Sequence, residues 1–335
     1  MVRLRRRHAL AQILVGLIIL TCATCAPDMA EAQRAAPPWH IGVLMVSFLP
    51  ESKEAQAFRQ GLRDAGYAEG RDVVIEWRAA KGDYGRVPAL VDDLVQRKVD
   101  VIVVDTTLGA QQAKRATSTI PIVLAFVADP VASGLVPSLA HPSGNVTGLS
   151  MMITDLSAKQ LQLLKELAPG LGRVAVLWNP NSPYQARVIE DLKATAPPLG
   201  VDLTFISAQT PSDIAPAVAA VTRAHAQALY VIVDPMVSTN RVTLIDLVSK
   251  ARIPAIYPER RFADDGGLIS YGPNLADLFR RSAGYVDRIL KGSKPGELPI
   301  EQPVKFDCII NLKTARTLGL SIPQSVMLQA TEVIK

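Results

Sequence analysis

Several polar side chains stand just past short apolar runs, where they could bind a charged ligand. Ser47, Thr106, Thr107 and Asn179 each lie one to three residues beyond the end of such a run. If the runs are parallel strands, these residues gather at one edge of a sheet. A helix that begins at that edge presents free N–H groups, which suit a carboxylate. Helix capping and turn formation use the same residue types, so both interpretations stay open.

Two acidic residues and three tyrosines add to this set. Asp129 and Asp234 each precede a proline after an apolar run. Their carboxylates could accept a ligand ammonium, although an Asp-Pro turn needs no ligand. Tyr184, Tyr257 and Tyr271 could stack on a ligand or hydrogen-bond to it, because tyrosine has an apolar ring and a polar tip. Otherwise they are boundary residues at the sheet margin.

Sequence signatures of enzymes and cofactor sites are absent. The chain has no G-x-G-x-x-G after its first apolar run, no G-x-x-x-x-G-K-[ST], no H-E-x-x-H and no G-x-S-x-G. His40, His141 and His225 lie far apart in the sequence, which argues against a zinc site. Cys308 stands in an apolar run and is interpreted as a core residue. We therefore expect no cofactor, no metal and no catalytic residue.

Composition indicates a globular protein that does not bind nucleic acid. Hydrophobic residues make up 49% of the chain and charged residues 20%, which argues against disorder. The net charge is +5, but beyond the first residues Lys and Arg form no cluster that could follow a phosphate backbone. A length of 335 residues exceeds what one hydrophobic core usually serves, so two domains are expected.

The first 32 residues have the pattern of a cleavable signal peptide. A basic run precedes the uncharged apolar run 9–20, and an A-x-A pattern ends at Ala32. The apolar run is shorter than the roughly 20 residues that cross a bilayer. Cys22 and Cys25 lack the usual context of a lipid-modified cysteine. We expect a periplasmic protein without an internal disulfide, since Cys308 is then its single cysteine.

The remaining chain alternates strand, loop and helix patterns, which predicts an α/β fold. Apolar runs that begin at Ile41 and Val101 alternate with amphipathic helical patterns, and the same order recurs from Val174 and Leu229. Such alternation builds parallel sheets from βαβ units. The repeated order predicts two doubly wound parallel-sheet lobes, with a chance likeness of generic βαβ runs as the alternative.

Three turn-rich stretches divide these patterns and indicate that the chain passes between the lobes three times. Such a chain has a three-segment hinge, with a cleft at the facing strand ends. The helix 275–290 is expected on the first lobe, although it follows the second in sequence. The predicted boundaries are 38–127 plus 273–299 for the first lobe, 150–255 plus 304–335 for the second, and 128–149, 256–272 and 300–303 for the hinge.

A series of short segments carries a resemblance that covers essentially all of the chain after the signal peptide. In order, the segments are Ile41-Gly42-Val43-Leu44, Ile120-Pro121-Ile122-Val123, Asp129-Pro130-Val131, Ser143-Gly144-Asn145-Val146-Thr147-Gly148, Leu177-Trp178-Asn179-Pro180, Arg252-Ile253-Pro254-Ala255-Ile256-Tyr257 and Gly266-Gly267-Leu268-Ile269-Ser270-Tyr271-Gly272. With these segments the sequence resembles the periplasmic substrate-binding proteins of ABC importers, type I fold, and within them the tryptophan- and tyrosine-binding branch.

The resemblance implies a monomeric binding protein that is not an enzyme. Such a protein captures a small molecule between its lobes and delivers it to the permease subunits of an ABC transporter. The residues and the resemblance together favour a small amphiphilic carboxylate, an amino acid or an aromatic acid, over a sugar. A ligand-sensing partner of a membrane receptor on the same fold is the alternative, and an exported hydrolase is a further one.

Overall fold

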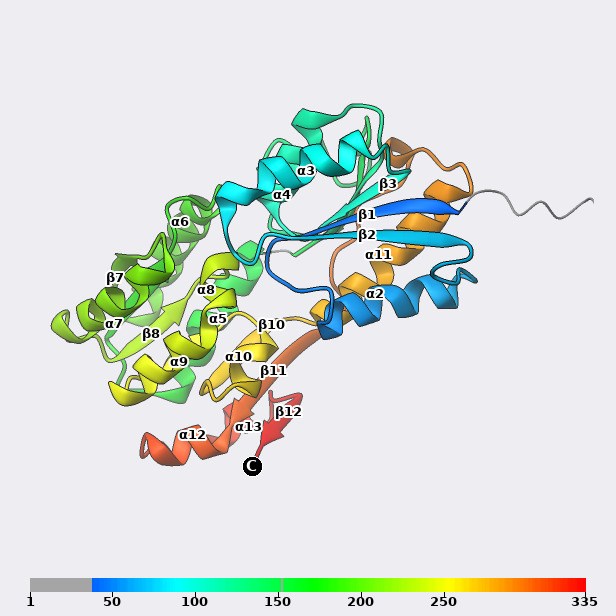
Figure 1. Cartoon of the computed structure of the whole chain (residues 1–335). Helices are drawn as coiled ribbons and strands as arrows, with labels where there is room; N and C mark the ends of the chain where they lie inside the picture. Colours follow the sequence, from blue (N-terminus) through cyan, green and yellow to red (C-terminus); the bar gives the residue numbers. More distant parts are fainter. Residues whose placement is uncertain (1–37, 152) are drawn as a thin grey trace, which may run out of the picture. The chain divides into compact units, whose positions relative to one another are not determined.

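The computed structural model describes residues 38–151 and 153–335, except for the side chains of 153–155. The expected signal peptide, residues 1–32, lies outside this part of the chain. No helix within the described residues is both long enough and apolar enough to cross a membrane. The strands and helices of residues 39–335 form two α/β lobes, one around each of two sheets (Figure 1).

The first lobe is built on a five-stranded sheet whose strands are all parallel. Their order across the sheet is β2-β1-β3-β4-β5. The strands are β1 (Trp39–Met45), β2 (Val73–Ala79), β3 (Val101–Val104), β4 (Ile122–Val127) and β5 (Val146–Ser150). Every residue of β3, β4 and β5 is buried, as expected for parallel strands covered on both faces.

Helices cover both faces of this sheet because alternate strand residues point to opposite sides. Ile41 and Val43 belong to one core cluster, whereas Leu44 belongs to another. On the first side lie α2 (Lys53–Asp64) and α11 (Leu275–Leu290), which pack against each other. On the second side lie α3 (Val87–Gln96) and α4 (Thr107–Ala116).

The second lobe is built on a seven-stranded sheet of order β12-β11-β10-β9-β8-β6-β7. Its strands are β6 (Arg173–Trp178), β7 (Asp202–Ser207), β8 (Ala228–Val231), β9 (Ala255–Tyr257), β10 (Ile269–Pro273), β11 (Phe306–Asn311) and β12 (Glu332–Ile334). The pair β10–β11 is antiparallel and all other pairs are parallel. The last two strands therefore run against the rest of the sheet.

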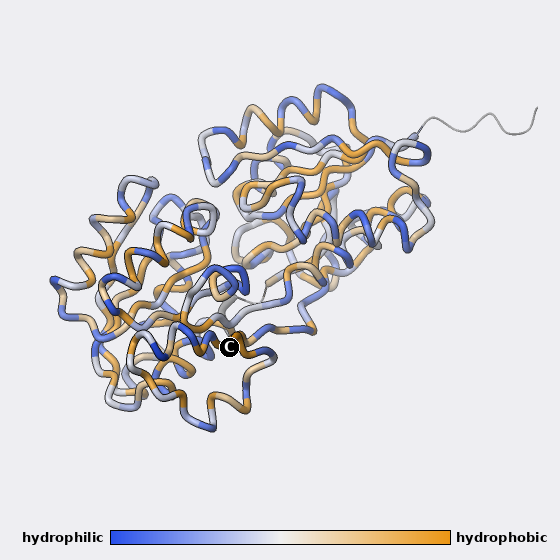
Figure 2. Tube along the Cα trace, turned by 60° about the horizontal axis from the view of Figure 1, so that its bottom comes forward, coloured by the Kyte–Doolittle hydropathy of each residue, from blue (hydrophilic) through white to orange (hydrophobic). Residues whose placement is uncertain are grey.

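Helices cover the second sheet in the same way. The helices are α5 (Ile153–Leu167), α6 (Gln185–Thr195), α7 (Ile214–Arg223), α8 (Pro235–Thr239), α9 (Arg241–Lys250), α10 (Arg260–Asp264), α12 (Leu312–Thr317) and α13 (Gln324–Met327). Val174 and Val176 share a core cluster with residues of α5 and α6, whereas Ala175 and Leu177 pack with α7 and α9. Figure 2 shows apolar residues concentrated along the inner strands and hydrophilic ones on the outer helices and turns. The expected fold class, two doubly wound α/β lobes, is confirmed.

The chain crosses between the sheets after β5, between β10 and α11, and before β11. Parts of the expected hinge segments belong instead to the sheets: 146–149 lies in β5, 256–257 in β9 and 269–272 in β10. Gly148 and Gly272 stand inside these strands, where a neighbouring backbone comes too close for a side chain. A Cβ on Gly148 would lie 2.3 Å from the Leu124 carbonyl oxygen, and one on Gly272 would lie 2.0 Å from that of Pro258.

We predict that Gly61→Ala destabilises the first lobe by separating α11 from α2. A Cβ on Gly61 would lie 2.4 Å from the Arg280 carbonyl oxygen and 2.7 Å from the Ala283 Cβ, so one of the helices must move. Overpacking of this kind costs about 1–3 kcal/mol of unfolding free energy. Urea unfolding followed by circular dichroism measures the loss.

Gly284→Ala is the matched control, because Gly284 lies in α11 and a Cβ there meets no atom within 4 Å. In this exposed helical position alanine should stabilise by up to about 1 kcal/mol. Equal unfolding midpoints for the two variants would contradict the packing of α11 on the first lobe.

Candidate ligand-binding site

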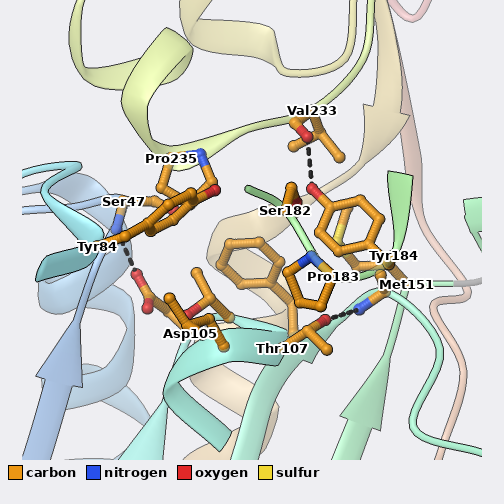
Figure 3. Close-up of a pocket in the computed structure, with 14 residues that line it drawn as sticks. Ser47, Tyr84, Asp105, Thr107, Met151, Ser182, Pro183, Tyr184, Val233 and Pro235 are labelled. Atoms are coloured by element: carbon orange, nitrogen blue, oxygen red, sulfur yellow. Dashed lines mark hydrogen bonds between the residues drawn. The ribbon is translucent and has the colours of Figure 1, made fainter. Parts of the chain in front are cut away.

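A narrow cavity lies where the carboxyl ends of the parallel strands of the two lobes face each other (Figure 3). Residues of both lobes and of the first crossing line it, namely Ser47, Tyr84, Asp105, Thr106, Thr107, Leu108, Phe126, Ala128, Met151, Ser182, Pro183, Tyr184, Val233 and Pro235. These side chains approach one another so closely that the cavity has little free space. A ligand larger than a few atoms can therefore enter only when the lobes separate.

Asp105 forms the charged part of the cavity wall. It follows β3 directly and is 1% exposed. Because β1 and β3 are neighbours, the carboxylate reaches the end of β1, where it accepts hydrogen bonds from the N–H groups of Val46 (2.8 Å) and Ser47 (2.9 Å). Burial raises the pKa of Asp105 to about 7, and the two N–H groups and the Arg261 charge oppose this rise.

The N-terminus of α4 lies beside Asp105 in the cavity wall. Thr106 caps this helix through its hydroxyl, which accepts a hydrogen bond from the Gly109 N–H at 3.1 Å. The Thr107 hydroxyl accepts one from the Ala128 N–H at 3.4 Å. Both hydroxyls are thus engaged within the first lobe. The first turn of α4 still leaves backbone N–H groups without partners inside the helix.

The second lobe supplies aromatic and hydroxyl groups from the loop between β6 and α6. The Tyr184 hydroxyl and the Gln185 amide both donate to the Val233 carbonyl, which fixes this loop against the end of β8. The Ser182 hydroxyl lies near the Tyr84 and Tyr184 hydroxyls but reaches hydrogen-bond geometry with neither. Ser182 is 5% exposed, so the wall contains a buried polar atom without a protein partner in the described chain.

Two hydrogen bonds connect the lobes at the margins of the cavity. The Tyr84 hydroxyl donates to Asp234 Oδ2 at 2.6 Å, and Arg261 Nη1 donates to the Ser47 carbonyl at 3.0 Å. Arg261 also lies over the Phe48 ring, with its guanidinium carbon 4.2 Å from the ring centre. The buried Glu259 carboxylate holds Arg261 at 2.5 Å. Arg261 thus donates to the carbonyl of Ser47, the same residue whose N–H donates to Asp105.

Four residues that the sequence suggested line this cavity: Ser47, Thr106, Thr107 and Tyr184. Asn179 and Asp234 lie beside it. Asn179 is fully buried, its Oδ1 accepts the Asn181 N–H, and its Nδ2 faces Asp234 without reaching hydrogen-bond geometry. Asp234 caps α8 by accepting the N–H groups of Met236 and Val237.

Three suggested residues lie away from the cavity. Asp129 accepts the N–H groups of Val131 and Ala132, so its carboxylate stabilises a turn. Tyr257 is 2% exposed and stacks on Phe262, with ring centres 4.9 Å apart. Tyr271, in β10, stacks on Phe306 of the antiparallel neighbour β11, with ring centres 6.2 Å apart. Each has a structural partner where it stands.

Sequence reasoning passed over Tyr84, Asp105, Phe126 and Ser182 as site residues. Asp105 and Ser182 had a detectable signal, because both stand just after a strand that ends at the same sheet edge as Ser47 or Asn179. No sequence signal marked Tyr84 as a site residue, because its hydrogen-bond partner Asp234 is 150 residues away in the sequence. Among the described residues no group of His, Cys, Asp and Glu could hold a metal ion.

Comparisons with known proteins agree with this architecture. The chain is 27% identical over 268 residues to a tyrosine-binding protein of Clostridioides difficile (strain R20291), a match that covers 80% of this chain and 77% of the relative. A domain from Streptococcus pneumonia, solved in complex with L-Trp, is 28% identical with a TM-score of 0.81, over 89% of this chain and 100% of that one.

A second solved structure has a similar identity but a lower structural likeness. The ligand-free, open structure of a substrate-binding protein with adhesive properties from Clostridium difficile is 26% identical, with a TM-score of 0.63, over 89% of this chain and 99% of that one. The family model of ABC transporter substrate-binding proteins matches residues 43–334, which is nearly the whole described chain. The chain therefore belongs to the ABC transporter substrate-binding protein family.

Proposed function

We propose that this protein captures an amino acid between its two lobes and presents it to an import permease. The charge of the cavity carries the proposal. Asp105 is the single charged side chain among the described residues that line it, and no basic side chain lies among them. A buried carboxylate needs a positive partner, so a ligand that brings an ammonium group fits and a ligand with only negative charge does not.

The remaining groups of the cavity suit the other parts of an amino acid. The N–H groups at the start of α4 and the Ser182 hydroxyl are donors for a carboxylate. Tyr84, Phe126 and Tyr184 offer ring surface for an apolar side chain. With a separate place for each charge and an apolar region between the lobes, the cavity favours a zwitterion over a sugar or an aromatic acid that lacks nitrogen.

The relatives support an aromatic amino acid in particular. One is named a tyrosine-binding protein and another was solved with L-Trp, and both match most of this chain. We infer that L-tyrosine and L-tryptophan are the first ligands to test. Asn179 and Asp234 then act from behind the cavity wall, through the loops that carry Ser182 and Tyr184, rather than by direct contact.

Export and delivery complete the proposal. Proteins of this family work outside the cytoplasmic membrane, and the basic and apolar start of the sequence fits secretion. We propose that the protein is periplasmic, works as a monomer, contacts the permease subunits of an ABC transporter and catalyses no reaction. Binding without chemistry is the role that the family name describes.

The first test is calorimetry of the purified protein with L-tyrosine, L-tryptophan, des-amino tyrosine (3-(4-hydroxyphenyl)propionate) and glucose. We expect at least one of the two amino acids to bind. The des-amino compound should bind at least about tenfold more weakly, because its complex leaves Asp105 without a counter-charge. Equal affinity for the des-amino compound, or tight binding of glucose, would contradict the proposal.

Asp105→Asn tests the charge itself. Asparagine keeps the size of the side chain and can still accept a hydrogen bond from Val46 or Ser47, but it carries no charge. The variant should bind the amino acid about 10- to 100-fold more weakly and bind the des-amino compound with little change. Asp129→Asn is the matched control, since Asp129 lies outside the cavity, and its affinities should equal those of the wild type.

The affinity for the amino acid should also depend on pH, and the raised pKa of Asp105 determines the direction of this dependence. With a pKa of about 7 in the arrangement of lobes seen here, the Asp105 carboxyl is largely protonated at pH 5.5 and ionised at pH 8. Binding of an ammonium needs the ionised form, so affinity should fall about tenfold or more from pH 8 to pH 5.5. Asp105→Asn should show no such fall. Calorimetric titrations at several pH values measure the affinity, and melting temperatures at the same pH values check that the protein stays folded. A wild-type affinity that does not change with pH would contradict the pairing of Asp105 with the ligand ammonium.

A further inference from the structure

The loop between β2 and the short helix 84–86 brings first-lobe backbone into direct contact with the second lobe. Gly82 is buried in this loop at a φ of +78°. A Cβ built on it would lie 2.9 Å from the Pro235 carbonyl oxygen and 2.9 Å from the Thr239 hydroxyl. Only a residue without a side chain fits between the loop and α8 at this distance.

The first lobe holds this loop firmly. The Ala80 and Gly82 N–H groups donate to the carbonyls of Met45 and Val46 at 2.8 Å each, which anchors the loop to the end of β1. The Asp83 carboxylate accepts the Gly85 N–H and caps the turn that carries Tyr84. The loop therefore meets α8 as a preformed surface.

Tyr84 adds a directional bond to this contact. Its hydroxyl donates to Asp234 Oδ2, while Asp234 Oδ1 accepts two N–H groups of α8. Asp234 is 1% exposed, and its Oδ2 also accepts a longer hydrogen bond, of 3.4 Å, from the Gln185 amide. Separation of the lobes removes the shorter of these two bonds and gives Oδ2 access to water.

We propose that residues 80–84 are a latch that seats on the start of α8, holds the lobes closed and sets how long a ligand stays bound. Tyr84 and Pro235 both line the cavity, so the latch and the cavity close together. The arrangement seen here superposes better on the L-Trp complex than on the open, ligand-free relative at comparable identity. That the latch holds the lobes closed follows from the lobe contacts alone. That it sets how long a ligand stays bound rests on the proposed function.

Gly82→Ala tests the latch without touching the cavity, because Gly82 is not among its lining residues. The added methyl group collides with the backbone of α8 and should keep the lobes apart. Gly70→Ala is the matched control: Gly70 is another first-lobe loop glycine with a positive φ, of +87°, and a Cβ there meets no atom within 4 Å. Both variants carry the backbone penalty of alanine at positive φ, and only one carries the collision.

Lobe separation is measured with spin labels at Gln96→Cys and Ala194→Cys, which are exposed positions on α3 and α6 far from the latch. The protein is used without residues 1–32, the expected signal peptide, and the buried Cys308 stays unlabelled because burial raises the pKa of its thiol to about 11. Pulsed electron paramagnetic resonance then gives the distances between the labels with and without L-tyrosine at about 1 mM, a concentration above typical dissociation constants. Stopped-flow fluorescence gives the dissociation rate of the ligand.

We expect a population with the short label distance of the closed lobes in the wild type and in Gly70→Ala. In Gly82→Ala this population should be absent or strongly reduced. Ligand dissociation should be about tenfold or more faster in Gly82→Ala and several-fold faster in Tyr84→Phe, which lacks the hydroxyl. An unchanged closed population in Gly82→Ala, or a wild type that shows only the open distance under both conditions, would overturn the latch. Calorimetry that finds no amino acid bound would overturn the proposed function instead, while the distances still decide the latch.

Discussion

The burial of one carboxylate, that of Asp105, is the constraint on which the site depends. Its two backbone partners at the end of β1 stabilise the ionised form, yet burial outweighs them and the pKa still rises. The nearest cation is Arg261 of the other lobe, which Glu259 already neutralises. The site therefore lacks a full counter-charge of its own, and a ligand ammonium is the group that would supply it.

The second lobe also contains a buried carboxylate after one of its strands, but that carboxylate has different partners. In both sheets the strand order begins alike, β2-β1-β3 in one and β7-β6-β8 in the other, and Asp105 and Asp234 follow the third strand of each set in sequence. Asp234 receives N–H groups of α8 and the Tyr84 hydroxyl. Asp105 receives no side-chain donor from any described residue. The two carboxylates thus differ in their partners: Asp234 accepts a bond from the other lobe, whereas Asp105 accepts only backbone N–H groups of its own lobe among the described residues.

Sequence patterns predicted the strands, most helices and the edge at which the site lies, because each depends on local periodicity. They failed where the role of a residue depends on a contact with another helix or strand. Tyr257 and Tyr271 carry the same residue type as Tyr184, but Phe262 and Phe306 occupy their rings. Gly148 and Gly272 lie in stretches that the sequence assigns to the hinge, whereas they stand in strands where a second backbone comes too close for a side chain. No local pattern distinguishes these cases, since the partner that decides lies on another element.

The contacts between the lobes are of a kind that permits release as well as capture. A hydrogen bond such as that of Tyr84 to Asp234 is exchanged for bonds to water when the lobes part, so its net contribution is only about 1–3 kcal/mol. The backbone contact at Gly82 adds dispersion over a small area. These contacts alone would favour closure weakly, and under the proposed function an ammonium paired with Asp105 would add differential affinity for the closed state. A stronger latch would close the cavity before a ligand could enter, and so the modest strength of these contacts is itself what the binding cycle requires.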